Sequence, residues 1–266
     1  MGAMTAAPTI LIFDSGLGGL TVFREVVKAR PDARFVYAAD DAFFPYARQD
    51  EGKLVTRVLD VMEALTAAHR PDLVVIACNT ASTLVLPALR AKFEVPFVGT
   101  VPAIKPACAS SNSKLVTVLG TEATVKREYT RALIRDYAQG CAVTLVGSPR
   151  LAELAEAELK GERVSDADVL AELAPCFVEA NGKRTDTVVL ACTHYPLLLQ
   201  RFEKLVPWPV NFIDPAPAIA RRVLDLLGAA KPSASAEPVR FIFTSGTPPS
   251  AALQAALGRF GAALAV

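Results

Sequence analysis

The chain has 266 residues, of which 52% are hydrophobic, and 28 Lys and Arg residues offset 27 Asp and Glu residues to leave a formal charge of +1. That length suffices for one large domain or two smaller ones with a sizeable core. The balanced charge, without a basic block or an interleaved aromatic stripe, argues against nucleic acid as the primary partner, and the apolar runs are far shorter than the roughly 20 residues that cross a bilayer.

Strand-like and helix-like segments alternate along the first part of the chain. Short apolar runs predict strands at residues 9–13, 34–39, 73–77 and 96–100. Helical periodicity separates them, at residues 20–29, 53–69 and 83–93. This alternation is typical of βαβ units, and it predicts a mainly parallel sheet covered by helices on both faces.

The alternation restarts after a polar stretch at residues 109–114. It predicts strands at 114–120, 142–147 and 187–191 and helices at 125–138, 149–161 and 196–205. The segment 228–238, rich in Ala, Pro and Ser, predicts a solvated loop before a late strand at 239–244 and a last short helix. We expect this tail to pack on the first half, because the second half already holds a full set of strands.

Two stretches of the sequence read alike, PDLVVIACNTAS with Cys78 and TDTVVLACTHYP with Cys192. Each predicts a buried strand that delivers a thiol at its carboxyl end. Any two parallel strands share apolar runs, but further blocks recur in the same order. Asp14 precedes the first cysteine by 64 positions and Thr121 precedes the second by 71, and a proline follows each at similar offsets, at Pro102 and Pro215.

The repeat predicts an α/β fold of two pseudo-symmetric, doubly wound domains with mainly parallel sheets. We expect residues 1–101 with 211–266 to form the first domain and residues 102–210 to form the second. Ligands of such sheets bind at the carboxyl ends of the strands. The active site is therefore expected in the cleft between the domains.

The cysteines indicate a reducing compartment. They form an odd set without a CxxC pair, at Cys78, Cys108, Cys141, Cys176 and Cys192. The beginning of the chain, MGAMTAAPTILIF, lacks the features of a signal peptide, so a cytoplasmic location is expected, and MGAM resembles a cloning remnant. A structural zinc site is disfavoured, since the chain has two histidines and one of them, His69, ends a predicted helix. We take the three cysteines outside the repeats as ordinary small residues.

Each repeated cysteine stands where a strand gives way to a predicted helix, whose amino terminus is expected to lower the pKa of the thiol. Neutral groups surround both, and they suit a small anion such as a carboxylate. The charged candidates are Asp14, Glu156 and His194, although Asp14 also fits a helix cap and His194 a surface position. The turn DSGLGG lacks the GxGxxG spacing of a dinucleotide site. The neutral candidates are Ser15, Asn79, Thr80, Thr121, Thr124, Thr193 and the backbone of that turn.

Six motifs in this order resemble the glutamate racemases of bacteria. They are DSGLGGL, DDAFFPYA, ACNTAS, GTEATV, LAELAEAELKG and ACTHYP, and the segment SPRLAELAEAELKG is similar to the variant found in Gram-negative bacteria. The resemblance implies cofactor-independent proton transfer on glutamate that supplies D-glutamate for peptidoglycan. It also implies that Cys78 deprotonates D-glutamate and Cys192 deprotonates L-glutamate. In each direction the cysteine that removes the proton acts as a thiolate, and the opposite cysteine, as a thiol, donates a proton to the other face.

The resemblance implies supporting residues as well. Asp14 would assist Cys78, and His194 with Glu156 would assist Cys192. An activator from the peptidoglycan precursor pathway is compatible with it, and the sequence leaves a monomer or a homodimer open. The substrate-binding or supporting positions would be Asp14, Ser15, Tyr46, Ala47, Asn79, Thr80, Thr121, Thr193 and His194.

Ala47 departs from the pattern, since the family usually has glycine after Pro-Tyr. If that glycine provides a positive φ or a close backbone approach, a methyl group crowds the site or costs about 1 kcal/mol in strain. If only its N–H is used, alanine supplies the same donor. We expect activity to survive, with weaker binding.

The sequence leaves three alternatives open. A sister enzyme of the same superfamily could act on aspartate, a hydantoin or maleate. A non-catalytic small-anion binding protein would also have two lobes around a cleft, but it would not need a cysteine at both equivalent strand ends. A hydrolase with Cys192 as nucleophile and His194 as base is disfavoured because no oxyanion motif accompanies the pair.

Overall fold

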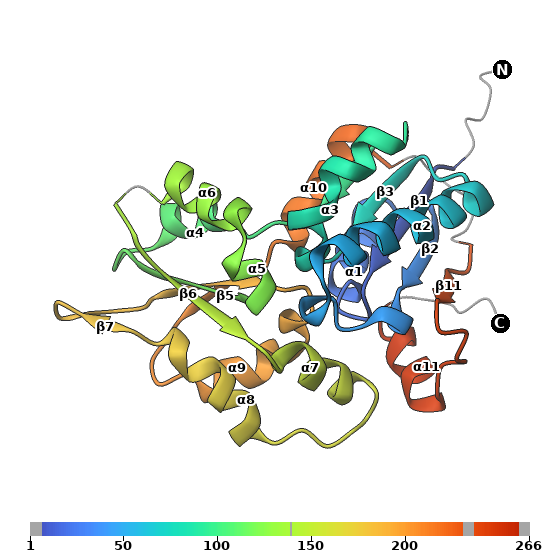
Figure 1. Cartoon of the computed structure of the whole chain (residues 1–266). Coiled ribbons are helices and arrows are strands. Elements are labelled where there is room, and N and C mark those ends of the chain that lie inside the picture. The colour runs from blue at the N-terminus through green and yellow to red at the C-terminus, as the bar shows by residue number, and fades with distance from the viewer. Residues whose placement is uncertain (1–6, 139, 231–236, 261–266) are drawn as a thin grey trace.

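The computed structural model describes residues 7–138, 140–230 and 237–260, and it forms two α/β halves, each built on its own sheet (Figure 1). The first half contains β1 (Thr9–Asp14), α1 (Leu20–Ala29), β2 (Arg34–Ala39), the 3-10 helices η1 (Asp41–Phe43) and η2 (Tyr46–Arg48), α2 (Glu51–His69), β3 (Leu73–Ile76), α3 (Asn79–Lys92) and β4 (Phe97–Gly99). After the second half the chain returns to it with α10 (Ala216–Leu227), β11 (Arg240–Phe243) and α11 (Ala251–Gly258).

The second half is one continuous stretch of chain. Its elements are α4 (Ile104–Ser110), β5 (Leu115–Thr121), α5 (Glu122–Lys126), α6 (Glu128–Tyr137), β6 (Ala142–Ser148), α7 (Leu151–Leu159), α8 (Asp166–Leu173), η3 (Ala174–Cys176), β7 (Glu179–Ala180), β8 (Lys183–Arg184), β9 (Thr187–Ala191), η4 (Tyr195–Leu198), α9 (Leu199–Leu205) and β10 (Asn211–Ile213). The short hairpin of β7 and β8 is antiparallel, whereas all strand pairs in the two main sheets are parallel.

The two main sheets have the same strand order, which confirms the predicted pseudo-symmetry of the fold. The first sheet runs β11-β2-β1-β3-β4 and the second runs β10-β9-β5-β6. Read from the opposite edge, the second sheet is β6-β5-β9-β10, so β1 matches β5 and β3 matches β9. The two cysteine motifs therefore follow equivalent strands. Strand β11 is the extra edge strand, and it pairs with β2 as the predicted packing of the tail requires.

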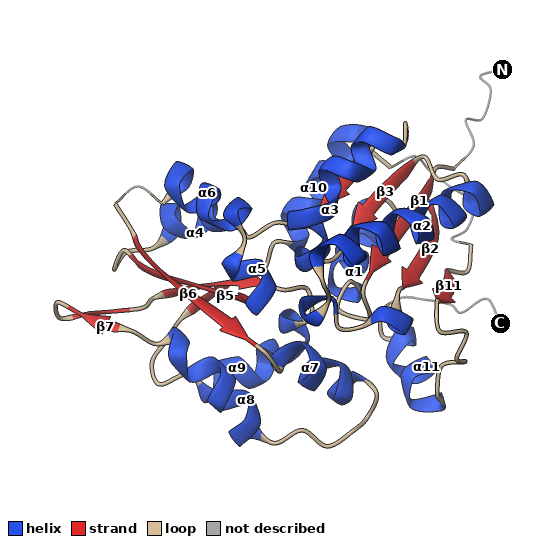
Figure 2. Cartoon of the chain, viewed as in Figure 1, coloured by secondary structure: helices blue, strands red, loops and turns tan. Residues whose placement is uncertain are grey.

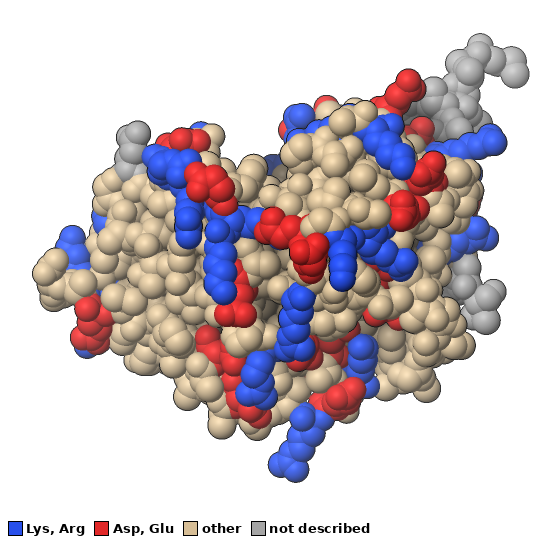
Figure 3. Space-filling model, viewed as in Figure 1, with Lys and Arg blue, Asp and Glu red and all other residues tan. Residues whose placement is uncertain are grey.

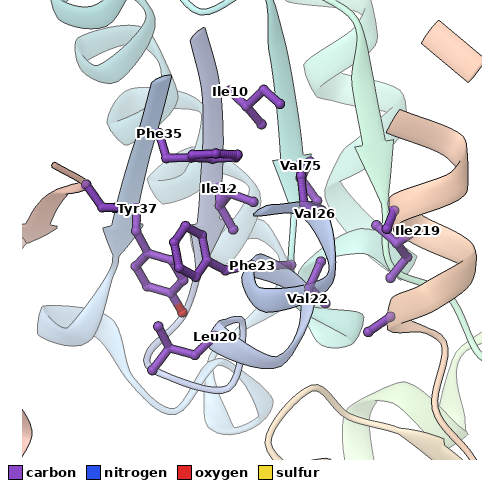
Figure 4. Packing of buried hydrophobic residues seen from close by; sticks show 14 of the residues in the cluster. Ile10, Ile12, Leu20, Val22, Phe23, Val26, Phe35, Tyr37, Val75 and Ile219 are labelled. Carbon is purple, nitrogen blue, oxygen red and sulfur yellow. The ribbon is translucent and has the colours of Figure 1, made fainter. Parts of the chain in front are cut away.

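The strands are apolar on both faces because helices cover both faces of each sheet (Figure 2). In β1, Ile10 and Ile12 face α1 and α10, while Leu11 and Phe13 face α2 and α3. Figure 4 shows the first of these layers, where Phe23 of α1 packs edge-on against the aromatic rings of β2. This dense packing fixes the strand ends, and with them the residues that follow each strand.

Several local expectations need correction. The helix predicted at 125–138 is broken at Arg127, whose backbone is extended (φ −67°, ψ 140°), so that α5 and α6 are separate. Helices α4, α8 and α10 were not predicted. Residues 211–213 were assigned to the first domain, but as β10 they pair with β9 of the second sheet, so the chain leaves that sheet only after Ile213. Residues 211–213 belong to the second half because they form strand hydrogen bonds with β9, although they lie close to the point where the chain returns to the first half.

Two expectations fall on residues that are not described. The segment MGAM lies within residues 1–6, and most of the predicted solvated loop lies within residues 231–236. Within the described parts of the chain, no helix combines the length and the apolar character that crossing a membrane requires.

Candidate active site

Both motif cysteines line one small cavity between the two halves. Its volume is about 20 Å³, which is room for about one water molecule. The first half contributes Ser15, Phe44, Pro45, Tyr46, Ala47, Cys78, Asn79 and Thr80, and the second half contributes Thr121, Ala152, Cys192, Thr193 and His194. The strand equivalence explains this convergence, since the carboxyl ends of β3 and β9 face the same space.

Cys78 is the residue before α3, two positions after the end of β3. Its Sγ donates to Oγ of Ser15 over 3.6 Å, and the Ser15 hydroxyl donates to Oδ1 of Asp14 over 3.5 Å. The other carboxylate oxygen of Asp14 accepts a hydrogen bond from the N–H of Gly19 at 2.9 Å. A short polar chain thus connects the first thiol with a buried carboxyl group that lies behind the cavity wall.

Burial dominates the ionisation of this pair. It raises the pKa of Asp14, and together with the charge of Asp14 it raises the pKa of the Cys78 thiol, although the N–H of Ala81 and the Ser15 hydroxyl oppose the latter change. The expectation that a helix amino terminus lowers the pKa of this thiol is therefore wrong for the closed site. Desolvation of a thiolate outweighs the helix dipole when the sulfur is almost entirely buried.

Cys192 has a different set of partners. Its Sγ lies 3.8 Å from Nδ1 of His194, and Nε2 of the same ring lies 2.9 Å from Oε1 of Glu156 on α7. The second oxygen of Glu156 accepts a hydrogen bond from Nζ of Lys160 at 2.9 Å. The second thiol therefore faces an imidazole that a buried carboxylate orients.

This group of side chains favours a charged pair. Burial opposes ionisation of Glu156, but the hydrogen bond and charge of His194, with the contribution of Lys160, lower its pKa to about 2. Burial also opposes protonation of His194, yet its hydrogen bonds to Cys192 and Glu156 raise the pKa of the imidazole well above its usual range. His194 is thus held as an imidazolium that can stabilise a thiolate on Cys192.

The glycine-rich turn between β1 and α1 reaches across to the second half. The N–H of Leu17 donates to Oε1 of Glu156 at 2.8 Å, and the N–H of Gly18 lies 3.2 Å from Nε2 of His194. A β-carbon on Gly16 would lie 2.0 Å from Oε1 of Glu156, and one on Gly18 would lie 2.3 Å from Nδ1 of His194. The glycines of DSGLGG serve this close approach between the halves.

Hydroxyl groups meet across the cavity as well. Oγ1 of Thr80 lies 2.9 Å from Oγ1 of Thr121, which lies 2.9 Å from Oγ1 of Thr124. Beside them, both side-chain polar atoms of Asn79 are buried and have no hydrogen-bond partner among the described residues. An unpartnered buried amide is costly, and its position on the cavity wall suits a polar ligand.

Tyr46 and Ala47 form another part of the wall. The Tyr46 hydroxyl donates to Oδ2 of Asp40 at 2.7 Å, and Arg57 binds the same carboxylate, so that the tyrosine is held by its hydroxyl. Ala47 is not among the non-glycine residues with positive φ that occur in the described ranges. Its backbone therefore does not carry the strain considered above, and only crowding by its methyl group remains.

The structure brings together the predicted site residues with two qualifications. Asp14, Thr124 and Glu156 do not line the cavity; they contact residues that do. Phe44, Pro45 and Ala152 line it but were not singled out from the sequence. The first two lie within the motif DDAFFPYA, which was a usable signal, whereas Ala152 has no side-chain chemistry to attract attention.

Ion pairs join the halves near the site. Arg48 of η2 contacts Glu153 of α7 at 2.7 Å, and Arg127 contacts Glu51 of α2 at 3.0 Å. Each half supplies one arginine and one glutamate. In Figure 3, Lys, Arg, Asp and Glu side chains gather where the halves meet.

Comparisons with known proteins agree with this arrangement. The family model for Asp/Glu/hydantoin racemases matches residues 15–223. The glutamate racemase of Brucella anthropi is 56% identical over 228 residues, which cover 85% of this chain and 82% of the relative, and that of Brucella canis is 55% identical over 235 residues, which cover 86% and 85%.

Solved structures of glutamate racemases superpose on nearly the whole chain. The crystal structure of Escherichia coli glutamate racemase in complex with L-glutamate and the activator UDP-MurNAc-ala has a TM-score of 0.88 and 41% identity, covering 97% of each chain. The glutamate racemase of Aquifex pyrophilus has a TM-score of 0.72 and 29% identity, covering 94% of this chain and 95% of that one.

Proposed function

The chain belongs to the Asp/Glu/hydantoin racemase family, and we propose that it interconverts L-glutamate and D-glutamate and so supplies D-glutamate for peptidoglycan synthesis. The observation that carries the proposal is the meeting of Cys78 and Cys192, from equivalent strands of two matched halves, at one small cavity. The two Brucella glutamate racemases named above share more than half of their aligned residues with this chain, which favours glutamate over aspartate, a hydantoin or maleate as the substrate.

The proposed reaction uses one thiol on each face of the substrate. The thiolate of Cys192 takes the proton from Cα of L-glutamate, breaking the C–H bond and forming S–H. The electron pair left on Cα takes the proton of the Cys78 thiol on the opposite face, which gives D-glutamate and a Cys78 thiolate. The reverse reaction starts from that form, so no cofactor is required for the balance of protons.

Supporting residues differ between the two thiols. His194 accepts the proton of Cys192 before substrate arrives and is held by Glu156. Asp14 and Ser15 support Cys78 through hydrogen bonds, since the thiol donates to the Ser15 hydroxyl and that hydroxyl donates to the Asp14 carboxylate. The hydroxyls of Thr80 and Thr121, with the free amide of Asn79 and the threonine that follows Cys192, offer donors for the substrate carboxylates.

The small volume of the cavity implies that the halves must separate for substrate to enter. A volume of about 20 Å³ is far too small for glutamate. Within the described residues the chain crosses between the halves only after β4 and after β10, so these crossings are the expected hinges. Opening must break the contacts of Leu17 and Gly18 with the second half and the two ion pairs between the halves.

Proton exchange in deuterated buffer tests the proposal. Purified protein is incubated with L-glutamate or D-glutamate without added cofactor, and the α-proton signal is followed by NMR alongside optical rotation. Loss of the signal from both enantiomers, with rotation decaying to zero, is the expected result. No exchange with either enantiomer would reject glutamate as the substrate.

Alanine variants of the two cysteines separate the alternatives. Cys78→Ala and Cys192→Ala should abolish racemisation yet leave glutamate binding, measured by calorimetry, largely intact. A binding protein would show no turnover before or after substitution. A cysteine hydrolase would instead show stoichiometric acylation of Cys192, which mass spectrometry of the intact protein detects.

We also propose that an anionic activator from the peptidoglycan precursor pathway binds on the opposite side of the crossings. A groove of about 550 Å³ lies there, between α3 and α10 of the first half and α4 and α6 of the second, and it forms the notch between the halves in Figure 3. Arg90, Lys105 and Arg222 supply positive charge, and Tyr129 and Tyr137 supply exposed rings. A ligand that touches both crossings can shift the equilibrium between open and closed states.

Titration with UDP-MurNAc-ala, the activator in the Escherichia coli structure, tests this proposal. The expected result is a rate increase that Lys105→Glu and Arg222→Glu weaken while leaving the basal rate unchanged. Equal activation of both variants would place the ligand elsewhere, and no activation of the unsubstituted protein would reject the activator. The five unpaired cysteines suit the reducing cytoplasm, which we propose as the location of the enzyme.

A further inference from the structure

Lys160 is a surface lysine whose ammonium group reaches a buried carboxylate at the active site. We propose that it is a positioning residue for proton transfer at Cys192, acting through Glu156 and His194. It does not line the cavity, and it was not among the residues that the sequence pointed to. The inference rests on the proposed racemisation, because it concerns one of the two proton transfers in that reaction.

The contacts around Glu156 leave little freedom to its carboxylate. Oε1 lies 2.9 Å from Nε2 of His194 and accepts the N–H of Leu17 at 2.8 Å, and Oε2 accepts Nζ of Lys160 at 2.9 Å. The Glu156 side chain is 5% exposed, whereas that of Lys160 is 42% exposed. Both oxygens are thus satisfied, and Lys160 is the described partner of Oε2. Without the ammonium group, that oxygen would be buried beside no donor and the carboxylate could turn away from His194.

Charge balance gives a second reason. When Cys192 is a thiolate and His194 an imidazolium, the buried group also contains the Glu156 carboxylate, so two negative charges share one positive charge. Lys160 supplies the second positive charge and makes the group neutral. A buried group with an unbalanced charge is strongly disfavoured, so Lys160 favours the ionised form of the Cys192 side that the reaction requires.

The burial of Glu156 and the short distance to Lys160 distinguish this pair from other lysine-glutamate pairs of the protein. Lys126 and Glu122 are also spaced four residues apart, but both are more than half exposed and their charged atoms lie 3.5 Å apart. Lys28 contacts Glu25 at 2.8 Å on α1, and neither residue touches the site. Lys28 therefore offers a matched control. Its replacement also removes a partly exposed ammonium group that is paired with a glutamate, but at a distance from the active site.

The test compares Lys160→Met, Lys160→Arg and Lys28→Met with the unsubstituted enzyme. L-glutamate and D-glutamate have equal free energies, so kcat/KM must be the same in both directions for every variant. The side that is affected is instead read from primary deuterium isotope effects on kcat/KM, measured separately with 2-deuterated L-glutamate and D-glutamate. Cys192 removes the label from the first substrate and Cys78 removes it from the second.

Loss of Lys160 should slow the step at Cys192 and make it more rate-limiting. For Lys160→Met we expect kcat/KM to fall roughly threefold in both directions, as suits a half-exposed ion pair. The isotope effect should rise with deuterated L-glutamate and fall with deuterated D-glutamate. Lys160→Arg should restore both values, and Lys28→Met should leave them unchanged.

Other outcomes would overturn the inference. Isotope effects that stay the same, or that move together for the two substrates, would show that Lys160 acts only on stability or on opening. A Lys160→Arg variant as impaired as Lys160→Met would exclude the ion pair as the cause. If the unsubstituted protein racemises glutamate while either result is found, the proposed function stands without the role of Lys160; if it does not racemise glutamate, both fall.

Discussion

Gly18 lies against the ring of His194, with its N–H 3.2 Å from Nε2 and with no room for a β-carbon, which would stand 2.3 Å from Nδ1. The two residues are 176 positions apart and belong to different halves. The contact ties the glycine-rich turn after β1 to the partner of Cys192. A change at a backbone turn of one half should therefore impair chemistry in the other.

The variant Gly18→Ala tests this coupling. The new methyl group must push His194 away from Cys192 or hold the halves apart, and a displacement of about 1 Å can cost about 100-fold in rate. We expect kcat to fall by about that factor while the circular dichroism spectrum is unchanged. Gly258→Ala is the control, since a β-carbon there meets no atom within 4 Å. Activity of Gly18→Ala near that of the control would contradict the coupling.

Asn79 should matter for binding and not for folding. Its side-chain amide has no partner in the closed protein, so Asn79→Ala removes a buried polar group that is already unsatisfied, and the free energy of unfolding should stay equal or rise by about 1 kcal/mol. KM for glutamate should rise at least about tenfold, because one good hydrogen bond to a charged ligand is lost.

Ser82, on the same helix, provides the contrast. Its Oγ donates to the carbonyl of Ile76 at 3.0 Å and accepts from the N–H of Thr100 at 2.9 Å. Ser82→Ala should therefore lower the free energy of unfolding by about 1–3 kcal/mol. Urea denaturation of both variants checks the pair, and a destabilised Asn79→Ala would mean that its amide has a structural role.

Thiol reagents should inactivate the enzyme, and glutamate should slow the loss. Cys78 and Cys192 are only 5% and 6% exposed, so alkylation by iodoacetamide depends on opening of the halves, and bound substrate keeps the thiols covered. Residual activity against time, with and without glutamate, gives the rates. The same protection is expected in Cys141→Ala, which lacks a partly exposed thiol outside the cavity. Inactivation that glutamate leaves unaffected would implicate a cysteine elsewhere.

Asp186 should make stability depend on pH far from the site. Burial opposes its ionisation, but hydrogen bonds from Ser111, Ser113, Thr187 and Asn112 lower its pKa to about 2. Because the folded pKa is below the usual value of 3.8, its stabilisation is complete above about pH 5 and is lost as the pH falls toward 2. Asp186→Ala should cost about 1–2 kcal/mol at pH 7, at the low end for charged hydrogen bonds because the side chain is partly exposed.

Urea midpoints measured at several pH values check this prediction. The difference between Asp186→Ala and the unsubstituted protein should shrink as the pH is lowered from 5 to about 2.5. Asp225→Ala, which removes an exposed carboxylate 3.8 Å from Arg222, should show little difference at any pH. A pH-independent cost of Asp186→Ala would mean that packing, and not the carboxylate, is responsible.

The local pattern of the sequence was enough to predict the strands and their buried faces. Runs such as Leu73–Ile76 are apolar throughout because helices cover both faces of a parallel sheet. A continuous apolar run of this kind can be recognised from neighbouring residues alone. The sequence pattern did not predict the structure correctly where local preference and tertiary contacts favour different backbone conformations. Arg127 interrupts a helical stretch, and residues 211–213 form an edge strand too short to be recognised without its neighbour β9.

The sequence by itself determined the two halves, their repeated cysteines and the family resemblance, because strand periodicity and short motifs are properties of neighbouring residues. Only the tertiary structure decided which groups share the site and how they ionise. Burial raises the pKa of the Cys78 thiol, against the expectation from a helix terminus alone. The placing of Glu156 between His194 and Lys160, and of Gly18 against His194, depends on contacts between distant segments, which local pattern does not encode.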